Sequence, residues 1–399
     1  MAKARSLRYQ VQSMTDYDFD IPVTFRHRIR FTKDAFSEGN TVVGDLLEAE
    51  RERKVIVFVE SEIVRLFPLL PTQIKSYLGA LKNVTLTEIV VMPGGEGCKI
   101  SKTEIMDGIS PIERNGIDRH SYVFCIGGGA FLDVVGLAAA TAHRGVRLVR
   151  FPTTTLAQDD SGVGVKNGIN AFGKKNFIGS FAVPYAVVND FQFLYTQSER
   201  INRSGLSEAV KVALVKEGGF FDWLEENGEE LNALEPAVLE EAVERSAILH
   251  ARHIAEGGDP FETGNSRPLD FGHWSAHKME QLTEFGLSHA EAVSVGVAVD
   301  TLYSARSGWL PEKDAWRVIG LLQTLQLPIW HEALEMRGED GRRRIFNGLE
   351  EFREHLGGRL TVLMLQEVGK GFDLHELDEN LLEACIEELR EASCAAVPA

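Results

Sequence analysis

The chain has 399 residues, a net charge of −17 and 44% hydrophobic residues. This length predicts two domains or one large one, and the composition is that of a globular protein with a substantial core. A surface this acidic repels nucleic acid and anionic lipid, and for this reason we expect neither as a main partner. The sequence shows no membrane-spanning apolar run, no secretory signal pattern and four scattered cysteines. We therefore expect a cytoplasmic protein with reduced thiols.

Short apolar runs alternate with helical patterns in the first half of the chain. We expect buried parallel strands at 55–60, 88–93, 122–129 and 147–154. Amphipathic helical patterns lie between them, at 67–82 and 132–144. This alternation predicts an α/β, doubly wound, Rossmann-like sheet. Residues 1–20 and 394–399 are expected to be loosely ordered.

The pattern changes to long amphipathic segments from about residue 196. The helical candidates are 204–226, 236–256, 272–282, 288–308 and 314–325. A single short strand candidate follows at 360–365. We therefore expect an N-terminal Rossmann-like domain over 1–190 and a C-terminal all-α domain over 191–399.

Three consecutive glycines, Gly127, Gly128 and Gly129, join a strand candidate to the helix candidate after it. Without Cβ atoms, this backbone can approach a pyrophosphate at a helix N-terminus. The spacing departs from the G-x-G-x-x-G pattern, so a plain tight turn is the alternative. Asp133, one helical turn further on, either accepts a hydrogen bond from a ligand or faces solvent.

A second glycine turn, at 92–100, places Glu96 and Lys99 after another strand candidate. Two such turns at one sheet edge form the walls of a dinucleotide crevice. The alternative is a surface turn.

Residues 151–181 read as a long polar loop rich in glycine. Long loops are usually functional or disordered, and the apolar residues around this one argue against disorder. Lysines beside amide donors in an acidic protein suit a phosphate or carboxylate pocket, and a solvated basic loop is the alternative. The polar residues are Asp159, Asp160, Lys166, Asn170, Lys174, Lys175 and Asn176.

Glu208 and Lys211 are three residues apart on a helix candidate and so share a face. The spacing alone favours an ordinary solvated surface pair.

Three histidines gather within 17 positions of the second half. His273 and His277 share a helix face, and His289 follows Ser288, which can cap a new helix. Histidines with a carboxylate are typical of catalytic zinc sites, although a single histidine is more often a packed core residue. Periodicity does not choose among the carboxylates Glu208, Glu280 and Glu291.

These motifs, in this order, resemble the 3-dehydroquinate synthase family of NAD-dependent sugar phosphate cyclases. The resemblance runs from about residue 55 to about 300 and includes PGGEGCK, GGGAFLDVVGLAAATAHRG, FPTTTLAQDDSGVGVKNGIN, SGLSEAVK, FGHWSAH and HAEAV. It implies a Rossmann-like domain followed by a helical domain, with a small sugar phosphate as the substrate.

The resemblance also implies a role for each matching residue. The metal ligands, for Zn²⁺ or Co²⁺, are Glu208, His273 and His289. The active-site polar residues are Asp160, Lys166, Lys175, Asn176, Lys211 and His277. The NAD contacts are Glu96, Lys99, Gly128, Gly129, Asp133, Thr153 and Thr154. Arg144 matches an arginine that reaches a neighbouring subunit's site, which implies a homodimer.

The implied chemistry is a transient oxidation followed by ring closure. NAD oxidises a substrate hydroxyl, and the resulting ketone acidifies the neighbouring C–H so that phosphate leaves by β-elimination. Hydride then returns, the ring opens, and an intramolecular aldol addition closes a carbocycle. The resemblance assigns stabilisation of the alkoxide to Lys211, and retention of the leaving phosphate to Lys166, Asn176 and His277.

The sequence departs from the family pattern where the substrate carboxylate is gripped. Where a 3-dehydroquinate synthase typically has G-L-R-x-x-L-N-F-G-H, this chain has Ser266 in place of the arginine, Arg267 one place later, and Asp270 in place of the asparagine. An upstream lysine appears as Arg252, and a lysine-rich segment as 350–358. Arg267 rescues the grip only if the backbone shifts.

Losing a bidentate carboxylate partner and adding an anion weakens binding of a 2-keto acid sugar. The departures therefore favour a substrate such as sedoheptulose 7-phosphate over the 3-dehydroquinate precursor. The rival from another reaction class is a metal-dependent polyol dehydrogenase of the glycerol dehydrogenase type, which has no need of the phosphate cluster.

Overall fold

The computed structural model describes residues 17–47, 51–99, 102–172, 174–264, 266–355 and 358–395. The expectations for residues 1–16 and 396–399 lie outside this part of the chain. Every helix within it is too short or too polar to cross a bilayer.

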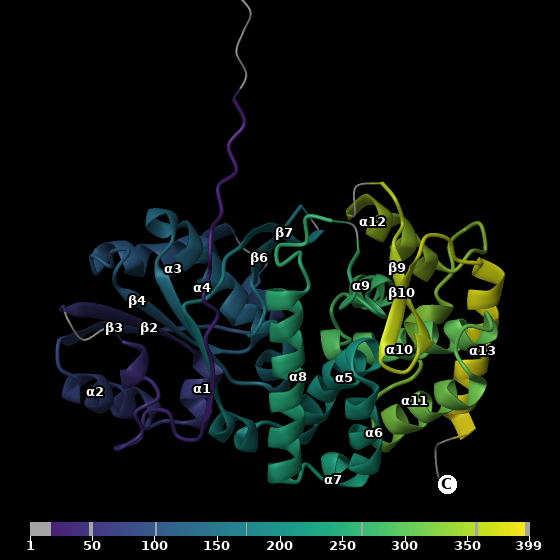
Figure 1. Ribbon diagram of the computed structural model, residues 1–399, viewed down its shortest axis with the longest axis horizontal. Coiled ribbons are helices and arrows are strands. Elements are labelled where there is room, and N and C mark those ends of the chain that lie inside the picture. The colour runs from purple at the N-terminus through teal and green to yellow at the C-terminus, as the bar shows by residue number, and fades with distance from the viewer. Residues whose placement is uncertain are drawn as a thin grey trace, which may run out of the picture.

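Six parallel strands form the central sheet, in the order β1-β8-β5-β4-β2-β3 (Figure 1). Their bounds are β1 Ile29–Thr32, β2 Arg53–Glu60, β3 Val84–Met92, β4 Tyr122–Gly127, β5 Arg147–Pro152 and β8 Ala186–Asp190. The four strands expected from apolar runs are confirmed as β2, β3, β4 and β5. Strands β1 and β8 extend the sheet beyond them, and the fold class is α/β as expected.

Helices cover both faces of this sheet because each central strand is apolar on both sides. In β2, Val57 packs with Ile74 of α2 on one face, while Phe58 packs with Leu132 and Val135 of α4 on the other. The helices of this half are α1 Ser61–Leu66, α2 Leu70–Ala80, α3 Lys102–Arg114 and α4 Gly129–Thr141, with the 3-10 turns η1 Gly44–Leu46, η2 Glu96–Lys99 and η3 Ala142–Arg144.

The expectation of a long polar loop over residues 151–181 is wrong. This segment forms a π-helical turn, η4 Ala157–Ser161, and an antiparallel hairpin of β6 Lys166–Ala171 and β7 Lys174–Phe181. The buried guanidinium of Arg150 fixes the start of the hairpin by donating to the carbonyls of Gly162, Gly164 and Lys166 and to Asn167 Oδ1. The hairpin lacks a regular alternation of apolar residues, which would have predicted strand pairing. These four hydrogen bonds hold its start in place instead.

The second half is a helical body built around α10, whose residues are buried along most of its length. Its helices are α5 Glu199–Lys216, α6 Gly218–Glu226, α7 Gly228–Asn232, α8 Pro236–Glu256, α9 His273–Leu282, α10 His289–Arg306, α11 Glu312–Thr324, α12 Asn347–His355 and α13 Glu379–Ala395, with η5 Phe191–Thr196, η6 Glu332–Glu335 and η7 Arg344–Phe346. The strand expected at 360–365 becomes a hairpin of β9 Val362–Glu367 and β10 Lys370–Leu374, so this half is helical with one small β element.

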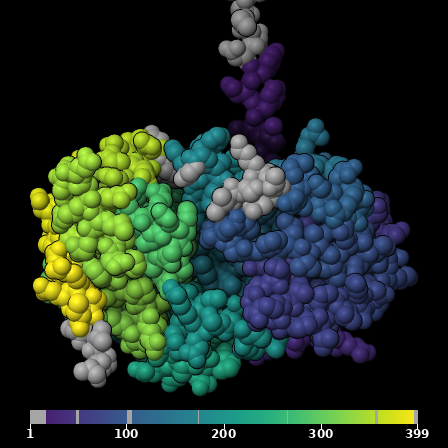
Figure 2. Space-filling view, turned by 180° about the vertical axis from the view of Figure 1, so that it is seen from behind, coloured from purple at the N-terminus to yellow at the C-terminus, as the bar shows by residue number. Residues whose placement is uncertain are grey.

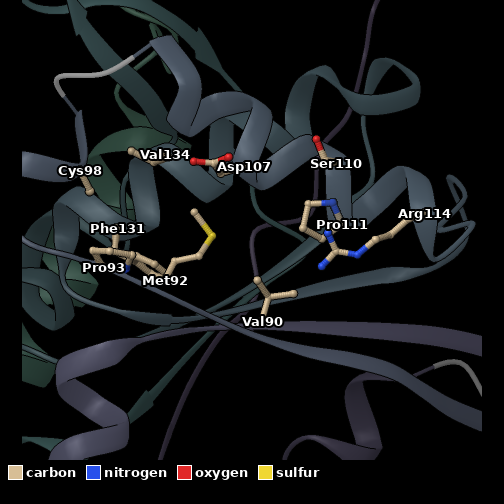
Figure 3. A pocket seen from close by; sticks show the side chains of 10 residues that line it. All are labelled: Val90, Met92, Pro93, Cys98, Asp107, Ser110, Pro111, Arg114, Phe131 and Val134. Carbon is tan, nitrogen blue, oxygen red and sulfur yellow. The ribbon is translucent and has the colours of Figure 1, made fainter.

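Helices α5 and α8 lie where the helical body meets the sheet (Figure 1). In this view β6 and β7 lie above α8, toward α9. From behind, the surface is hollowed between the blue residues of the first half and the green residues of the second (Figure 2). A separate hollow of about 340 Å³ lies within the first half, lined by Met92, Asp107, Arg114 and Phe131 among others (Figure 3). It adjoins η2 through Cys98, and the three clustered histidines do not line it.

Candidate active site

Three helices bring the expected metal ligands together. Glu208 lies in the buried middle of α5, while His273 and His289 are the first residues of α9 and α10. Glu208 Oε1 is 3.9 Å from the Nε2 atoms of both histidines. Its side chain is fully buried, and within the described part of the chain Oε1 has no hydrogen-bond donor. An unsatisfied buried carboxylate oxygen between two imidazoles fits a bound cation.

The other ring nitrogen of each histidine is already engaged. His273 Nδ1 lies 3.1 Å from the carbonyl oxygen of Phe271, and His289 Nδ1 lies 3.0 Å from Glu280 Oε2. Both acceptors require the proton on Nδ1, which leaves a lone pair on each Nε2. Burial, reinforced by the charge of Lys211, holds the pKa of His273 well below its usual value. The residues therefore present two imidazole Nε2 atoms and a carboxylate, a donor set that suits Zn²⁺ or Co²⁺.

His277 completes the histidine cluster from the second turn of α9. Its ligand atom lies within 4.8 Å of those of His273 and His289, and its ring stacks on His289 with a centroid separation of 5.7 Å. Burial lowers its pKa to about 4. A neutral His277 at the edge of the cluster can contact either the metal or a substrate oxygen.

A close contact between α9 and α10 sets the position of His273. Gly272 has φ +78°, and its carbonyl oxygen would be 2.0 Å from a Cβ added at Gly296. Asp300 of α10 accepts hydrogen bonds from Gly272 N at 2.9 Å and from Trp274 Nε1 at 2.8 Å. These bonds secure the residues on either side of the ligand, and burial raises the pKa of Asp300 to about 7.

Lys211 lies one helical turn beyond Glu208 and forms a buried ion pair with it. Burial lowers the pKa of Lys211, but Glu208 and Asp160 raise it by more, so the ammonium stays charged. Asp160 Oδ1 lies 3.9 Å from Lys211 Nζ and 2.8 Å from His250 Nδ1. The spacing-based expectation of a solvated Glu208–Lys211 pair is therefore wrong, because α5 is buried on all sides along this stretch.

Hairpin β6–β7 links the two halves of the site through adjacent residues. Lys175 Nζ is 2.5 Å from Glu280 Oε1, and Asn176 Oδ1 accepts a hydrogen bond from Lys99 Nζ at 2.9 Å. Lys99 also lies 2.5 Å from Asp133 Oδ2, so Asp133 is paired and not simply solvated. The hairpin thus places both residues between η2 and α9.

Two glycines allow neighbouring side chains to approach the N-terminus of α4 closely, near the carboxyl ends of the strands. Gly128 N donates to Glu60 Oε2 at 2.8 Å, and a Cβ on Gly129 would lie 2.5 Å from Ser161 Oγ. Glu96 Oε2 and Thr153 Oγ1 are buried without a hydrogen-bond partner in the described chain. Unsatisfied oxygens beside a glycine-lined helix N-terminus fit a dinucleotide with hydroxyl and phosphate groups.

Thr154, the remaining expected cofactor contact, starts the turn that follows β5. Its Oγ1 accepts a hydrogen bond from Ala157 N at 3.2 Å. The Cγ2 atom lies 3.6 Å from the position of a Cβ on Gly128. Thr154 is therefore next to the glycine-lined end of α4.

The residues of the altered carboxylate grip lie at the outer edge of the site. Lys166 Nζ is 2.5 Å from Glu262 Oε1, and Arg267 Nε is 3.2 Å from Glu262 Oε2. The guanidinium of Arg267 also donates to the carbonyls of Glu262, Gly264 and Ser266. Ser266 Oγ donates to Asp373 of β10. The nitrogens of Arg267 are thus engaged by its own loop.

Asp270 adds negative charge near Lys166. Partial desolvation lowers the pKa of Lys166, but the negative charges of Asp270 and Glu262 raise it by more. This edge therefore combines one lysine with two carboxylates.

Arg144 is the one expected site residue that the fold does not bring to this cluster. Arg144 is exposed on η3, which follows the last residue of α4. Gly129 is the first residue of α4, and a 13-residue helix is about 20 Å long, so the length of the helix separates Arg144 from Gly129. His143, Arg144 and Gly145 all have positive φ, and the side chains of His143 and Arg144 are exposed.

Three residues of the cluster were missed by sequence reasoning as site residues: Glu60, His250 and Glu280. Glu60 ends an apolar strand, which is a signal for a ligand-facing carboxylate at a sheet edge. Glu280 was noticed only as one of three possible carboxylates near the histidines. His250 gave no signal, because its contact with Asp160 spans 90 positions.

Two family models match the chain. They are described as 3-dehydroquinate synthase N-terminal, over residues 89–204, and 3-dehydroquinate synthase C-terminal, over 205–342. A 3-dehydroquinate synthase from Nitrosococcus oceani is 34% identical over 339 residues, which cover 84% of this chain and 91% of the relative.

Solved structures of two cyclases share the fold. ValA, a 2-epi-5-epi-valiolone synthase from Streptomyces hygroscopicus with NAD⁺ and Zn²⁺ bound, has a TM-score of 0.83 and 25% identity, covering 94% of this chain and all of that one. A 2-deoxy-scyllo-inosose synthase complexed with carbaglucose-6-phosphate, NAD⁺ and Co²⁺ has a TM-score of 0.74 and 23% identity, covering 90% and 96%.

Proposed function

The chain belongs to the 3-dehydroquinate synthase family, and from this membership we propose that it is an NAD- and zinc-dependent cyclase for a sugar phosphate without a carboxylate, such as sedoheptulose 7-phosphate. The observation that carries the substrate proposal is the engagement of Arg267. Its guanidinium donates to three carbonyls and contacts Glu262, and Ser266 bonds Asp373 instead of facing the lysines. A substrate carboxylate would meet Asp270 and Glu262, whereas a hydroxyl can donate to them.

We assign the metal to Glu208, His273 and His289, with His277 facing the substrate phosphate. When bound, NAD accepts and returns hydride, and the divalent metal polarises the substrate oxygen that is oxidised. Lys211 is placed to stabilise negative charge on that oxygen, because it is buried beside Glu208 and stays protonated. Asp160 supports Lys211 from the other side.

We assign binding of the substrate phosphate to residues of hairpin β6–β7 and of α9. Lys166 starts β6, whereas Lys175 and Asn176 lie near the turn end of the hairpin, and charge-assisted hydrogen bonds from lysine to phosphate are strong. His277 is neutral at pH 7, so it binds phosphate as an N–H donor and can also accept a proton. Lys166 and Lys175 must exchange their present carboxylate partners, Glu262 and Glu280, for phosphate when substrate arrives.

The NAD site is proposed along the carboxyl ends of β2, β4 and β5. Gly128 and Gly129 would meet the pyrophosphate, and Glu60, Glu96 and Lys99 would meet ribose hydroxyls. The remaining contacts proposed are Asp133, Thr153 and Thr154. The division at residue 190, which is also the last residue of β8, is proposed as the boundary between this domain and the metal- and substrate-binding domain.

We also propose a homodimer in a reducing compartment such as the cytoplasm. Arg144 is exposed on the turn after α4, at the opposite end of that helix from Gly129, as a residue serving a partner subunit requires. The four cysteines form no disulfide. Loss of turnover on changing Arg144→Ala, with an intact dimer by light scattering, is the expected result.

One experiment tests the reaction and the substrate together. The purified protein is incubated with NAD and Zn²⁺ and either sedoheptulose 7-phosphate or the seven-carbon 2-keto acid phosphate, and phosphate, product and net NADH are measured. We expect phosphate and a carbocycle from the first substrate with no net NADH. Phosphate from the 2-keto acid alone would overturn the substrate proposal, and net NADH without phosphate would indicate a polyol dehydrogenase.

A further inference from the structure

We propose that Glu280 is a positioning residue that links the metal site to the substrate-facing lysine Lys175. The proposal rests on the metal site proposed above, and it assigns a role to a residue that touches neither metal nor substrate. Glu280 lies seven residues after His273 in α9, so two helical turns place both side chains on one face of the helix. Its side chain is only 2% exposed.

The first link is to a metal ligand. Glu280 Oε2 accepts the Nδ1 proton of His289 at 3.0 Å, which directs the Nε2 lone pair of that ring toward Glu208. A carboxylate behind a metal-binding histidine fixes the tautomer and the ring orientation, and it makes the histidine a better donor to the metal. His273 has only a backbone carbonyl in the equivalent place.

The second link is to the hairpin. Glu280 Oε1 lies 2.5 Å from Lys175 Nζ, and the lysine side chain is 14% exposed. Each carboxylate oxygen therefore has its own partner, so the plane of the carboxylate is fixed from both ends. A shift of either His289 or Lys175 changes the position of the group that the other one contacts.

The burial of Glu280 distinguishes it from an ordinary surface partner. Lys278, on the same helix, pairs with Glu351 at 2.5 Å, and there the glutamate is 45% exposed. Such exposed pairs contribute little, whereas a buried carboxylate costs several kcal/mol unless its partners compensate. Glu351 is therefore a matched control, because it also contacts a lysine of α9 but lies away from the histidines.

The first test measures zinc affinity by competition with a chelator. Glu280→Gln keeps the size of the side chain and removes its charge, and we expect zinc to bind about 10- to 100-fold more weakly. Glu351→Gln should bind zinc as wild type does. Glu280→Asp, which retains the charge on a shorter side chain, should give an intermediate affinity and substitutes for Glu280→Gln if that variant does not fold.

A spectroscopic measurement separates positioning from a general loss of structure. In the Co²⁺-loaded protein, the ring N–H protons of the histidine ligands give shifted, exchangeable NMR signals. One of these signals should move or broaden in Glu280→Gln and stay unchanged in Glu351→Gln. Unchanged signals together with unchanged zinc affinity would overturn the proposal.

The link to Lys175 is tested by a double-mutant cycle on zinc affinity. Lys175→Ala should alter zinc affinity in the wild-type background and have no further effect in the Glu280→Gln background. Equal effects in both backgrounds would overturn the link. If the wild type itself binds no zinc, the metal site fails and this proposal with it; if wild type binds zinc and Glu280→Gln binds it equally well, only the role of Glu280 is refuted.

Discussion

Two of the lysine–glutamate pairs in the site lie in very different surroundings. The side chains of Lys211 and Glu208 are 3% and 0% exposed, whereas those of Lys166 and Glu262 are 56% and 29% exposed. Water screens the second pair, so its partners can be exchanged for a ligand at little cost. The first pair is expensive to break and so has a fixed geometry. The comparison separates a rigid chemical centre from an adaptable edge where the substrate is selected.

The largest expected effect comes from breaking the buried pair. Glu208→Ala leaves Lys211 buried without its ion-pair partner, with Asp160 Oδ1 3.9 Å away, so metal-free protein should lose about 3–5 kcal/mol in free energy of unfolding by urea denaturation. Adding Lys211→Met should recover part of this loss. Glu262→Ala should cost at most about 1 kcal/mol. Equal losses from the two glutamate variants would remove the distinction between centre and edge.

The next largest effect is expected from disturbing the close contact between α9 and α10. In Gly296→Ala the new Cβ would lie 2.0 Å from the carbonyl oxygen of Gly272, so α9 and α10 must move apart. We expect a loss of about 1–3 kcal/mol in stability and weaker zinc binding. The matched control is Gly320→Ala in α11, where a Cβ meets nothing within 4 Å and stability should rise slightly. Thermal unfolding and chelator competition measure both effects.

Asp300, a buried carboxylate that accepts hydrogen bonds from N–H donors, tests this comparison through the pH dependence of stability. Burial raises the pKa of Asp300 to about 7. Between about pH 4 and 7 the unfolded chain ionises this group while the folded chain keeps it protonated, so its contribution to stability falls as pH rises, by up to about 1.4 kcal/mol per pH unit. Denaturant unfolding at several pH values should show a shallower fall for Asp300→Asn. Parallel curves for variant and wild type would contradict this.

The smallest expected effect on stability belongs to the adaptable edge. Lys166→Ala should change the free energy of unfolding by less than about 1 kcal/mol, yet reduce phosphate release by about 10- to 100-fold or more because a charge-assisted contact is lost. NAD binding, measured by fluorescence titration, should be largely unchanged. Turnover that survives would show that phosphate binds elsewhere.

The sequence predicted the sheet better than it predicted the environment of individual charges. The apolar runs of β2 and β4 identify buried parallel strands, because both faces must be covered. The same i,i+3 spacing describes Glu208–Lys211 whether the helix is buried or exposed, so only the packing around α5 could decide. The hairpin at Lys166–Phe181 lacked an apolar alternation, and the contact of Ser266 with Asp373 joins residues 107 positions apart. Motif order supplied the site residues that spacing could not choose.

Lys175 and Asn176 are neighbours in β7, and their side chains contact different parts of the molecule. One reaches Glu280 in the helical half, and the other reaches Lys99 in the sheet half. A single peptide unit is therefore one connection between the two halves, beside the contacts of η4 with α5 and α8. Opening the molecule must release one of these contacts or carry the hairpin away with one body. We expect a displacement of Lys99 to shift Lys175 through this peptide unit, so ligand binding in one half should depend on ligand binding in the other.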